Sequence, residues 1–141
     1  MKKKVSFDYD ATLSRKDVQK FAKELVEQGV DVWIVTSRTS TEDIVARNWT
    51  WCLNQNEIVF EVAEQCGIPK ENIVFTDHID KINFLAGKDF LFHLDDDEDE
   101  LMEIVRSGDK CSPLHVNHFS WKENCVEVLN KKLWAGFGEI F

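Results

Sequence analysis

The sequence has no long hydrophobic run and is short of basic residues. No stretch of its 141 residues approaches the roughly 20 apolar residues that cross a bilayer. Lys2–Lys4 open the chain, but Asp8 and Asp10 follow where an export signal would carry its apolar segment. The net charge of −9 argues against a broad basic face for nucleic acid. We therefore expect a cytoplasmic protein that has no membrane partner.

Cysteine pairs at metal-binding spacing are also missing. The cysteines stand at positions 52, 66, 111 and 125, and none belongs to a Cys-x-x-Cys pair, which argues against a structural zinc site. Cys66 and Cys125 fall on the apolar faces of expected helices, where a thiol behaves as a small hydrophobic group. We predict four reduced thiols, as is usual in the cytoplasm.

The composition that remains is typical of one folded domain. Hydrophobic residues make up 43% of the chain and charged residues 30%, which is too apolar for a disordered protein. A chain of this length can bury one core, and neither an internal repeat nor a linker divides it. We expect a single domain over residues 1–141.

Strands and helices are expected to alternate along the chain. Apolar runs predict strands over 3–8, 30–36, 73–76, 89–94 and 114–116. Apolar residues at helical spacing, with start and stop signals, predict helices from Ser14 to Gly29, from near Asn54 to Gly67, over 98–107, and from Ser120 onward. This alternation predicts an α/β fold, a Rossmann-like three-layer sandwich with a mostly parallel five-stranded sheet.

Polar residues stand at the ends of the first four expected strands. They are Asp8, Thr36, Thr76 with Asp77, and Asp95. Each of them alone is a common residue at a strand end or a helix cap. Together they favour a functional site, because the carboxyl ends of parallel strands share one edge of the sheet and such sheets bind ligands there.

The residues around these positions resemble the motifs of the haloacid dehalogenase superfamily of phosphohydrolases. Segment 7–13, Phe-Asp-Tyr-Asp-Ala-Thr-Leu, is similar to the first motif, and segment 33–36, Trp-Ile-Val-Thr, is similar to the second. Lys81 lies where the family places its lysine, and the apolar run 90–94 with the following Asp95-Asp96 is similar to the fourth motif. The resemblance covers residues 4–100.

The resemblance implies a phosphatase that forms an aspartyl phosphate. In that reaction Asp8 attacks phosphorus, while Asp10 protonates the leaving group and then deprotonates the attacking water. Thr36 would bind a phosphoryl oxygen, and Lys81 would neutralise the nucleophile and the phosphate. These residue types suit the reaction, since a phosphoryl group repels a nucleophile unless the site supplies positive charge.

The resemblance also implies a bound Mg²⁺. Its expected ligands are Asp8, the backbone carbonyl of Asp10, and Asp95, with Asp96 as an outer or water-mediated partner. The acidic run continues over 97–100, where negative charge suits the start of the next helix. We therefore assign only Asp95 and Asp96 of this run to the metal.

Four further polar residues near the motifs are given supporting roles. Thr12 and Arg38 are expected to stabilise turns and caps, and His78 and His93 are expected to be structural.

The spacing of the motifs leaves no room for a large cap insertion. One expected helix and one expected strand fill each interval between motifs, so we predict an open site. Its substrate would be a phosphorylated small molecule, a nucleotide or a nucleic-acid end, because a bound cation offsets local negative charge. Segment 38–53 is a candidate partial lid, in which Trp49 and Trp51 either stack on a substrate or pack beneath the loop.

Two other functions remain open at this stage. A receiver-like domain would carry its phosphoacceptor after the third strand, at Asp77, and a noncatalytic binding module would keep only the fold. The motif at Asp8 and Asp10 argues against both. Phe137, Ile140 and Phe141 near the end of the chain are candidates for contacts in a homodimer.

Overall fold

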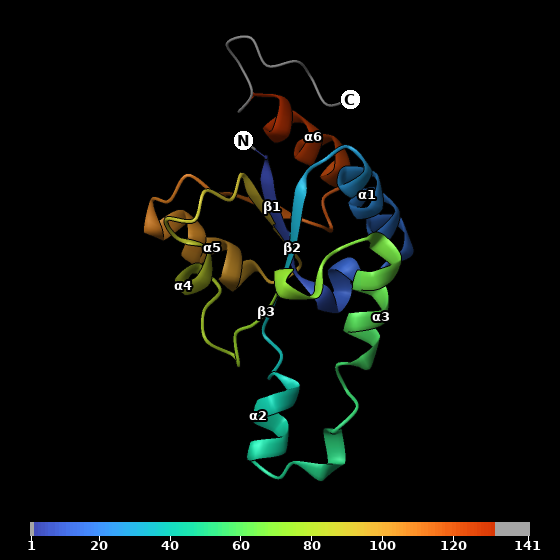
Figure 1. Ribbon diagram of the computed structural model, residues 1–141. Coiled ribbons are helices and arrows are strands. Elements are labelled where there is room, and N and C mark those ends of the chain that lie inside the picture. The colour runs from blue at the N-terminus through green and yellow to red at the C-terminus, as the bar shows by residue number, and fades with distance from the viewer. Residues whose placement is uncertain (1, 132–141) are drawn as a thin grey trace.

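A computed structural model of the chain describes residues 2–131. Its sheet has five strands: β1 (Lys4–Phe7), β2 (Asp31–Thr36), β3 (Ile73–Phe75), β4 (Phe92–Asp95) and β5 (Ser112–His115). All pairings are parallel, and the spatial order is β3-β2-β1-β4-β5 (Figure 1). The predicted Rossmann-like α/β fold with a five-stranded parallel sheet is confirmed.

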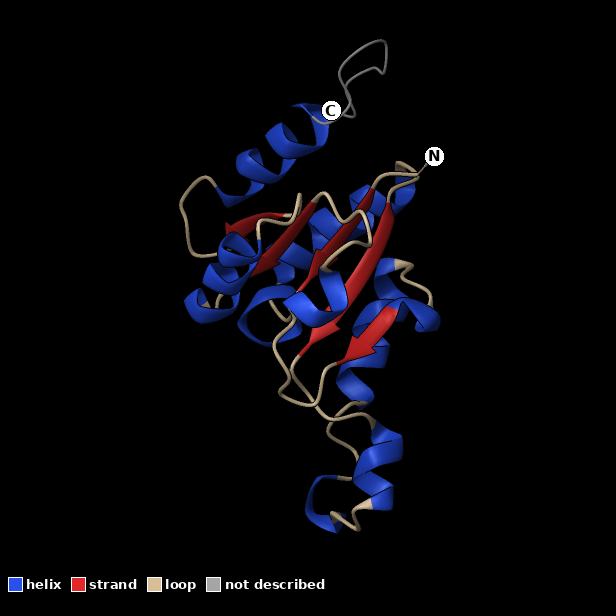
Figure 2. Ribbon diagram, turned by 90° about the vertical axis from the view of Figure 1, so that its left-hand side faces the viewer, coloured by secondary structure: helices blue, strands red, loops and turns tan. Residues whose placement is uncertain are grey.

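The helices form layers on the two faces of the sheet. On one face, α1 (Lys16–Glu27), α3 (Glu57–Cys66) and α6 (Trp121–Lys131) pack against the larger hydrophobic core. On the other face, α4 (Ile82–Leu85) and α5 (Glu98–Ser107) cover a smaller core (Figure 2). Because both faces are covered, even the polar side chains of the central strands, Ser6 and His93, are fully buried.

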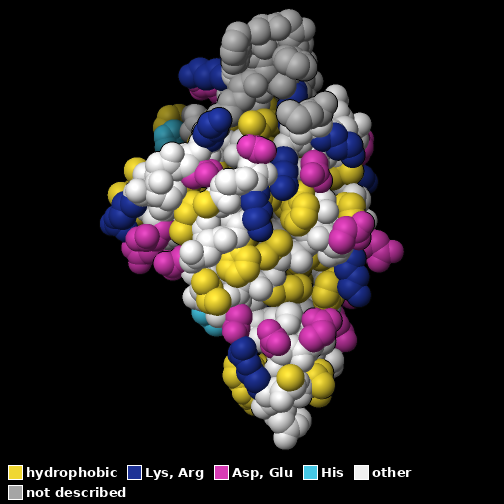
Figure 3. Space-filling model, turned by 60° about the vertical axis from the view of Figure 1, so that its left-hand side comes forward, with side chains coloured by type: hydrophobic (Ala, Val, Ile, Leu, Met, Phe, Trp, Pro, Cys, Tyr) yellow, Lys and Arg dark blue, Asp and Glu magenta, His cyan; other side chains and the backbone are white. Residues whose placement is uncertain are grey.

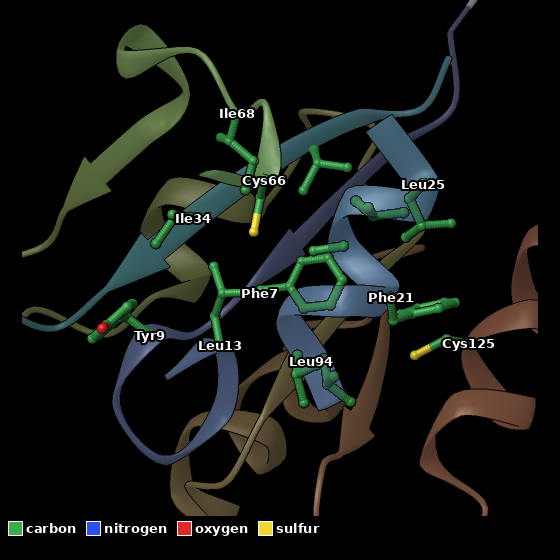
Figure 4. Close-up of a cluster of buried hydrophobic side chains, with 14 of the residues drawn as sticks. Phe7, Tyr9, Leu13, Phe21, Leu25, Ile34, Cys66, Ile68, Leu94 and Cys125 are labelled. Carbon is green, nitrogen blue, oxygen red and sulfur yellow. The ribbon is translucent and has the colours of Figure 1, made fainter. Parts of the chain in front are cut away.

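Aromatic side chains join the elements of the larger core. The ring of Phe7 on β1 makes edge contacts with Phe21 on α1 and Phe92 on β4, with centroids 6.3 and 5.7 Å apart (Figure 4). Phe21 in turn contacts Trp121 on α6, at 5.6 Å. The residue directly before Asp8 is therefore fixed by packing in the middle of the fold.

The order of the strands marks one place at the carboxyl edge of the sheet. From β1 the chain adds β2 and β3 on one side, and then crosses over to add β4 and β5 on the other side. The strand order therefore reverses at the boundary between β1 and β4. In open α/β sheets the ligand-binding crevice lies at this switch point. The amide of Asp8 donates to the carbonyl of Leu94 at 2.9 Å and so extends the β1–β4 pairing to that point.

Residues 37–56 form an arm between β2 and α3. It contains α2 (Thr41–Ala46) and the short turn η2 (Thr50–Cys52), and it projects beyond the carboxyl edge of the sheet (Figure 1). The side chain of Ser40 caps α2 by accepting the amide of Asp43 at 3.1 Å. Hydrophobic side chains gather at the projecting end, next to a band of acidic side chains (Figure 3).

Several predicted boundaries were wrong by a few residues. The first helix does not begin in a capping box at Ser14, because the Ser14 amide donates to the Tyr9 carbonyl and closes the turn η1 (Tyr9–Leu13). Arg15 is the N-cap instead. The fifth strand begins at Ser112 rather than at residue 114, because an edge strand tolerates Pro113.

Three general expectations can be compared with the structure. All four cysteines lie within the described residues, are buried, and form no disulfide. No helix between residues 2 and 131 has the length and apolar character that a membrane span requires. The proposed dimer residues Phe137, Ile140 and Phe141 lie outside the described residues.

The glycine that ends α3 provides a test of helix packing. Gly67 has φ +80°, and a Cβ at this position would lie 3.1 Å from Cγ1 of Val26 on α1, whereas Gly108 has φ +72° and open space around it. Gly108→Ala should lower the free energy of unfolding by about 1 kcal/mol through backbone strain alone. Gly67→Ala should cost about 1 kcal/mol more, because α1 and α3 must also separate. Equal losses in urea unfolding would contradict this account of the packing.

Candidate functional site

A pocket of about 210 Å³ opens at the carboxyl edge of the sheet, where β1 and β4 meet. It is smaller than the roughly 300–1,000 Å³ of most small-molecule sites. Its lining residues come from the ends of β1, β2 and β4 and from the start of α4: Asp8, Asp10, Ala11, Ser37, Lys81, Asp95, Asp96 and Asp97. Five of the eight are aspartates, so the pocket has the oxygen-rich chemistry of a cation site.

Lys81 joins the two strands at the base of the pocket. Its Nζ donates to Oδ1 of Asp8 at 2.8 Å and to Oδ2 of Asp95 at 2.6 Å. The three side chains are almost fully buried. The lysine is held from behind as well, because its backbone amide donates to Oε2 of Glu100 at 2.9 Å. Three predicted site residues thus lie in direct contact.

His93 and a backbone amide complete the surroundings of Asp95. Nε2 of His93 lies 2.7 Å from Oδ2 of Asp95, and Nδ1 lies 2.7 Å from the hydroxyl of Ser6. Burial lowers the pKa of His93, so the neutral ring donates from Nε2 and accepts from Ser6. The amide of Asp97 donates to the other oxygen of Asp95 at 3.0 Å. The contact between His93 and Asp95 was not predicted from the sequence, although the two residues, two positions apart, share one face of β4.

Lys81 can balance only one of the two buried carboxyl groups at the base of the pocket. Burial raises the pKa of Asp8 to about 8, because desolvation and the charge of Asp95 outweigh the attraction of Lys81. Burial acts on Asp95 in the same direction, but the hydrogen bond from His93 and the charge of Lys81 hold the pKa of Asp95 well below its ordinary value. Burial would lower the pKa of Lys81, but the two carboxylates raise it. Without a further cation, Asp8 therefore keeps its proton at neutral pH, and the ammonium of Lys81 is paired with ionised Asp95.

The residues present fit a divalent cation. Asp8, Asp95 and Asp96 each offer one oxygen, and these atoms lie within 4.8 Å of one another. Carboxylate oxygens are ligands that Mg²⁺ prefers, and its charge would compensate the second buried carboxylate. Asp96 is only half-buried, so it belongs to the open side of the group.

Asp10 lines the same pocket, but its carboxylate is paired with Arg38. Nε and Nη2 of Arg38 donate to the two oxygens of Asp10 at 2.9 and 2.7 Å. Asp10 belongs to the turn η1, in which the next residue, Ala11, adopts a left-handed conformation with φ +58°. Arg38 thus has a larger role than the cap support expected from the sequence, because it fixes a predicted catalytic carboxylate.

The two threonines predicted near the nucleophile differ in position. The hydroxyl of Thr12 donates to Oδ2 of Asp8 at 3.2 Å, so Thr12 helps to orient the carboxylate. Thr36 is fully buried, and its hydroxyl accepts the amide of Arg38 at 3.3 Å. Ser37, rather than Thr36, is the residue of this segment that lines the pocket. A contact between Thr36 and a phosphoryl oxygen stays a prediction.

Asp77 and the two tryptophans of the arm are not among the residues that line the pocket. The carboxylate of Asp77 accepts from Arg47 and from the hydroxyl of Thr39, and these contacts lower its pKa. Trp49 and Trp51 are not lining residues, and their rings lie 6.1 Å apart on the arm, with Trp51 80% exposed. Trp51 therefore does not pack beneath the loop, one of the two expected alternatives.

Comparisons with known protein families, curated proteins and solved structures found no match for this chain.

The imbalance of buried charge predicts opposite effects of two conservative substitutions. In chelator, Asp8→Asn should raise the free energy of unfolding by about 1–3 kcal/mol. The substitution removes a buried carboxyl group whose ionised form is disfavoured by burial and by the charge of Asp95. Asp95→Asn should lower it by about 3 kcal/mol, because its amide group would face the donors of Lys81 and His93. Denaturant unfolding measures both.

Mg²⁺ supplies the matched control for this experiment. Added Mg²⁺ should stabilise the wild type in a saturable way and stabilise Asp8→Asn much less. A loss of stability in Asp8→Asn similar to that in Asp95→Asn would show that Lys81 already balances both carboxylates.

Proposed function

We propose that the protein is a Mg²⁺-dependent phosphomonoester hydrolase that acts through an aspartyl phosphate on Asp8, as a member of the haloacid dehalogenase superfamily that its motifs resemble. One observation carries the proposal. At the switch point of the sheet, a buried Asp8 shares Lys81 with Asp95, within reach of a third carboxylate. A reactive carboxylate, a fixed cation and a metal-binding group are the parts that phosphoryl transfer to aspartate requires.

The first step transfers the phosphoryl group to Asp8. An oxygen of Asp8 forms a bond to phosphorus while the bond from phosphorus to the ester oxygen breaks, and Asp10 gives that oxygen a proton. Lys81 and Thr12 hold the two oxygens of the nucleophile, which limits the directions from which it can attack. Lys81 also offsets negative charge as the phosphoryl group approaches.

The second step returns Asp8 to its carboxylate form. Asp10, now ionised, takes a proton from water, and the water oxygen attacks phosphorus as the bond to Asp8 breaks. Inorganic phosphate leaves. Both steps need Asp10 to reach the substrate, so its carboxylate must leave Arg38 before it can act as the acid.

Asp8, Asp95 and Asp96 would hold Mg²⁺, with the backbone carbonyl of Asp10 as a further ligand implied by the resemblance. When bound, the ion supplies positive charge that favours ionised Asp8 and offsets the charge of the phosphate. Within the protein, His93 and the amide of Asp97 keep the Asp95 carboxylate in place for this task.

The strand order and the contacts of Asp77 disfavour the receiver-like alternative. The receiver CheY has the spatial order 2-1-3-4-5, whereas this sheet has the order 3-2-1-4-5. Asp77, the acceptor that this alternative requires, is occupied by Arg47 and Thr39. A noncatalytic module is tested by turnover.

Four thiols without a disulfide suit a reducing compartment, and we place the protein in the cytoplasm.

Hydrolysis of para-nitrophenyl phosphate tests the proposal. Turnover should require Mg²⁺, stop in chelator and fall about 1,000-fold or more in Asp8→Asn, because the substitution removes the carboxylate oxygen that attacks phosphorus. Asp10→Asn should slow both steps. Turnover that persists in a correctly folded Asp8→Asn protein would falsify the mechanism.

Two aspartates of the acidic run provide a matched pair for the metal. Asp96→Asn should raise the Mg²⁺ concentration needed for half-maximal turnover by about tenfold or more, as loss of one ligand from a cation site. Asp99→Asn should leave it unchanged, because Asp99 lies in the first turn of α5, outside the pocket's lining. The same shift in both variants would contradict the assignment of Asp96 as a metal ligand and of Asp99 as an acidic residue of the helix's first turn.

A further inference from the structure

Arg38 is held by two groups of the protein besides Asp10. Its Nη1 donates to the carbonyl of Gln55 at the base of the arm, and its guanidinium lies 5.1 Å from the ring centroid of Tyr9. Its side chain is 21% exposed, whereas that of Asp10 is 55% exposed. In this pair, then, the guanidinium is the anchored partner and the carboxylate is the partner with room to move.

The proposed chemistry requires this pair to open. A mostly buried guanidinium that loses its anion is costly, because it has given up most of its hydration. The scissile phosphate does not replace Asp10 there, since its partners in the proposed mechanism are Lys81 and the metal group. The acid step is therefore favoured when another anion takes the two donors of Arg38.

We propose that Arg38 binds a second anionic group of the substrate, at the position that the Asp10 carboxylate occupies in the structure. This inference rests on the proposed function and names its substrate class. The substrate would be a phosphomonoester that carries a second phosphate, a phosphodiester or a carboxylate near the scissile group. Two N–H donors side by side match two oxygens of each such group, which a lysine cannot do.

The second anion would couple binding to catalysis. As the second anion pairs with Arg38, the Asp10 carboxylate is released toward the leaving oxygen. A substrate without a second anion must break the Arg38–Asp10 ion pair with no new partner for Arg38, which lowers its kcat/KM. The acidic band beside the projecting end (Figure 3) and the net charge of −9 disfavour a long polyanion. A short substrate or a terminal phosphate fits these constraints best.

Matched substrates test the inference directly. Values of kcat/KM are compared for 3-phosphoglycerate against glycerol 3-phosphate, and for adenosine 3′,5′-bisphosphate against adenosine 5′-monophosphate. A phosphorylated dinucleotide adds the phosphodiester arm. General repulsion by an acidic protein predicts a preference for the member with less charge. The Arg38 site predicts a preference of roughly 10- to 100-fold for the second anion in at least one pair.

Variants assign that preference to one side chain. Arg38→Gln should abolish it, and Arg38→Lys, which keeps the charge and loses the paired donors, should retain only a small part. Arg47→Gln is the matched control. Arg47 lies on the same arm as Arg38, and it also contacts both oxygens of an aspartate, Asp77. Arg47→Gln should keep the full preference. Thermal unfolding of each variant establishes that it is folded.

A binding measurement separates this inference from the proposed function. Calorimetry at fixed free Mg²⁺ compares methylphosphonate with methylene-, ethylene- and propylenediphosphonate. At least one diphosphonate should bind tenfold or more tightly than methylphosphonate in the wild type and lose that advantage in Arg38→Gln. This advantage without turnover of any ester would keep the Arg38 site and reject the phosphatase. Turnover with no preference in either assay would keep the phosphatase and reject the Arg38 site.

Discussion

Two buried carboxylates on neighbouring strands share one ammonium group, and this contact sets the character of the whole site. Nζ of Lys81 lies 2.8 Å from Asp8 and 2.6 Å from Asp95, with all three side chains out of water. Without the lysine, two like charges would meet at the end of the sheet. With it, Asp95 is balanced, but Asp8 needs a further cation before it can ionise at neutral pH. The resulting attraction for a cation, rather than the shape of a deep pocket, is what this edge of the sheet provides.

The fold places this contact where packing is most rigid and leaves its surroundings adjustable. Asp8 follows Phe7, whose ring packs against two other aromatic rings, and Asp95 is held by His93 and by the amide of Asp97. Asp10 stands on a short turn and meets Arg38 at the base of the arm. The proposed nucleophile and metal ligand are thus buried and fixed, while the group that must transfer protons is half-exposed and held by an ion pair that has to open. This division suits a reaction in which only the acid and base have to move.

The sequence predicts those parts of the site that depend on strand ends, and misses those that depend on long-range pairing. Alternating apolar runs were sufficient for the parallel sheet and for the meeting of Asp8 and Asp95 at one edge, whereas Lys81 was expected there only from the family resemblance. The sequence predicts only a structural role for His93, because a lone histidine in an apolar strand is more often structural, although its spacing from Asp95 places both on one face of β4. The pairing of Arg38 with Asp10 joins residues 28 apart and depends on the left-handed conformation of Ala11. Ser14 resembled a helix cap, but a local turn took its amide first.

The central claim is that Asp8 carries the phosphoryl group, and chemical trapping of the intermediate tests it most directly. The protein is mixed with Mg²⁺ and para-nitrophenyl phosphate, quenched within a single turnover and reduced with borohydride, which converts an aspartyl phosphate into the side-chain alcohol. Peptide mass spectrometry then locates the reduced residue. The account predicts reduction at Asp8, and more of it in Asp10→Asn, where hydrolysis of the intermediate is slowed. Reduction at Asp77 or Asp95, or turnover with no reduced residue, would contradict it.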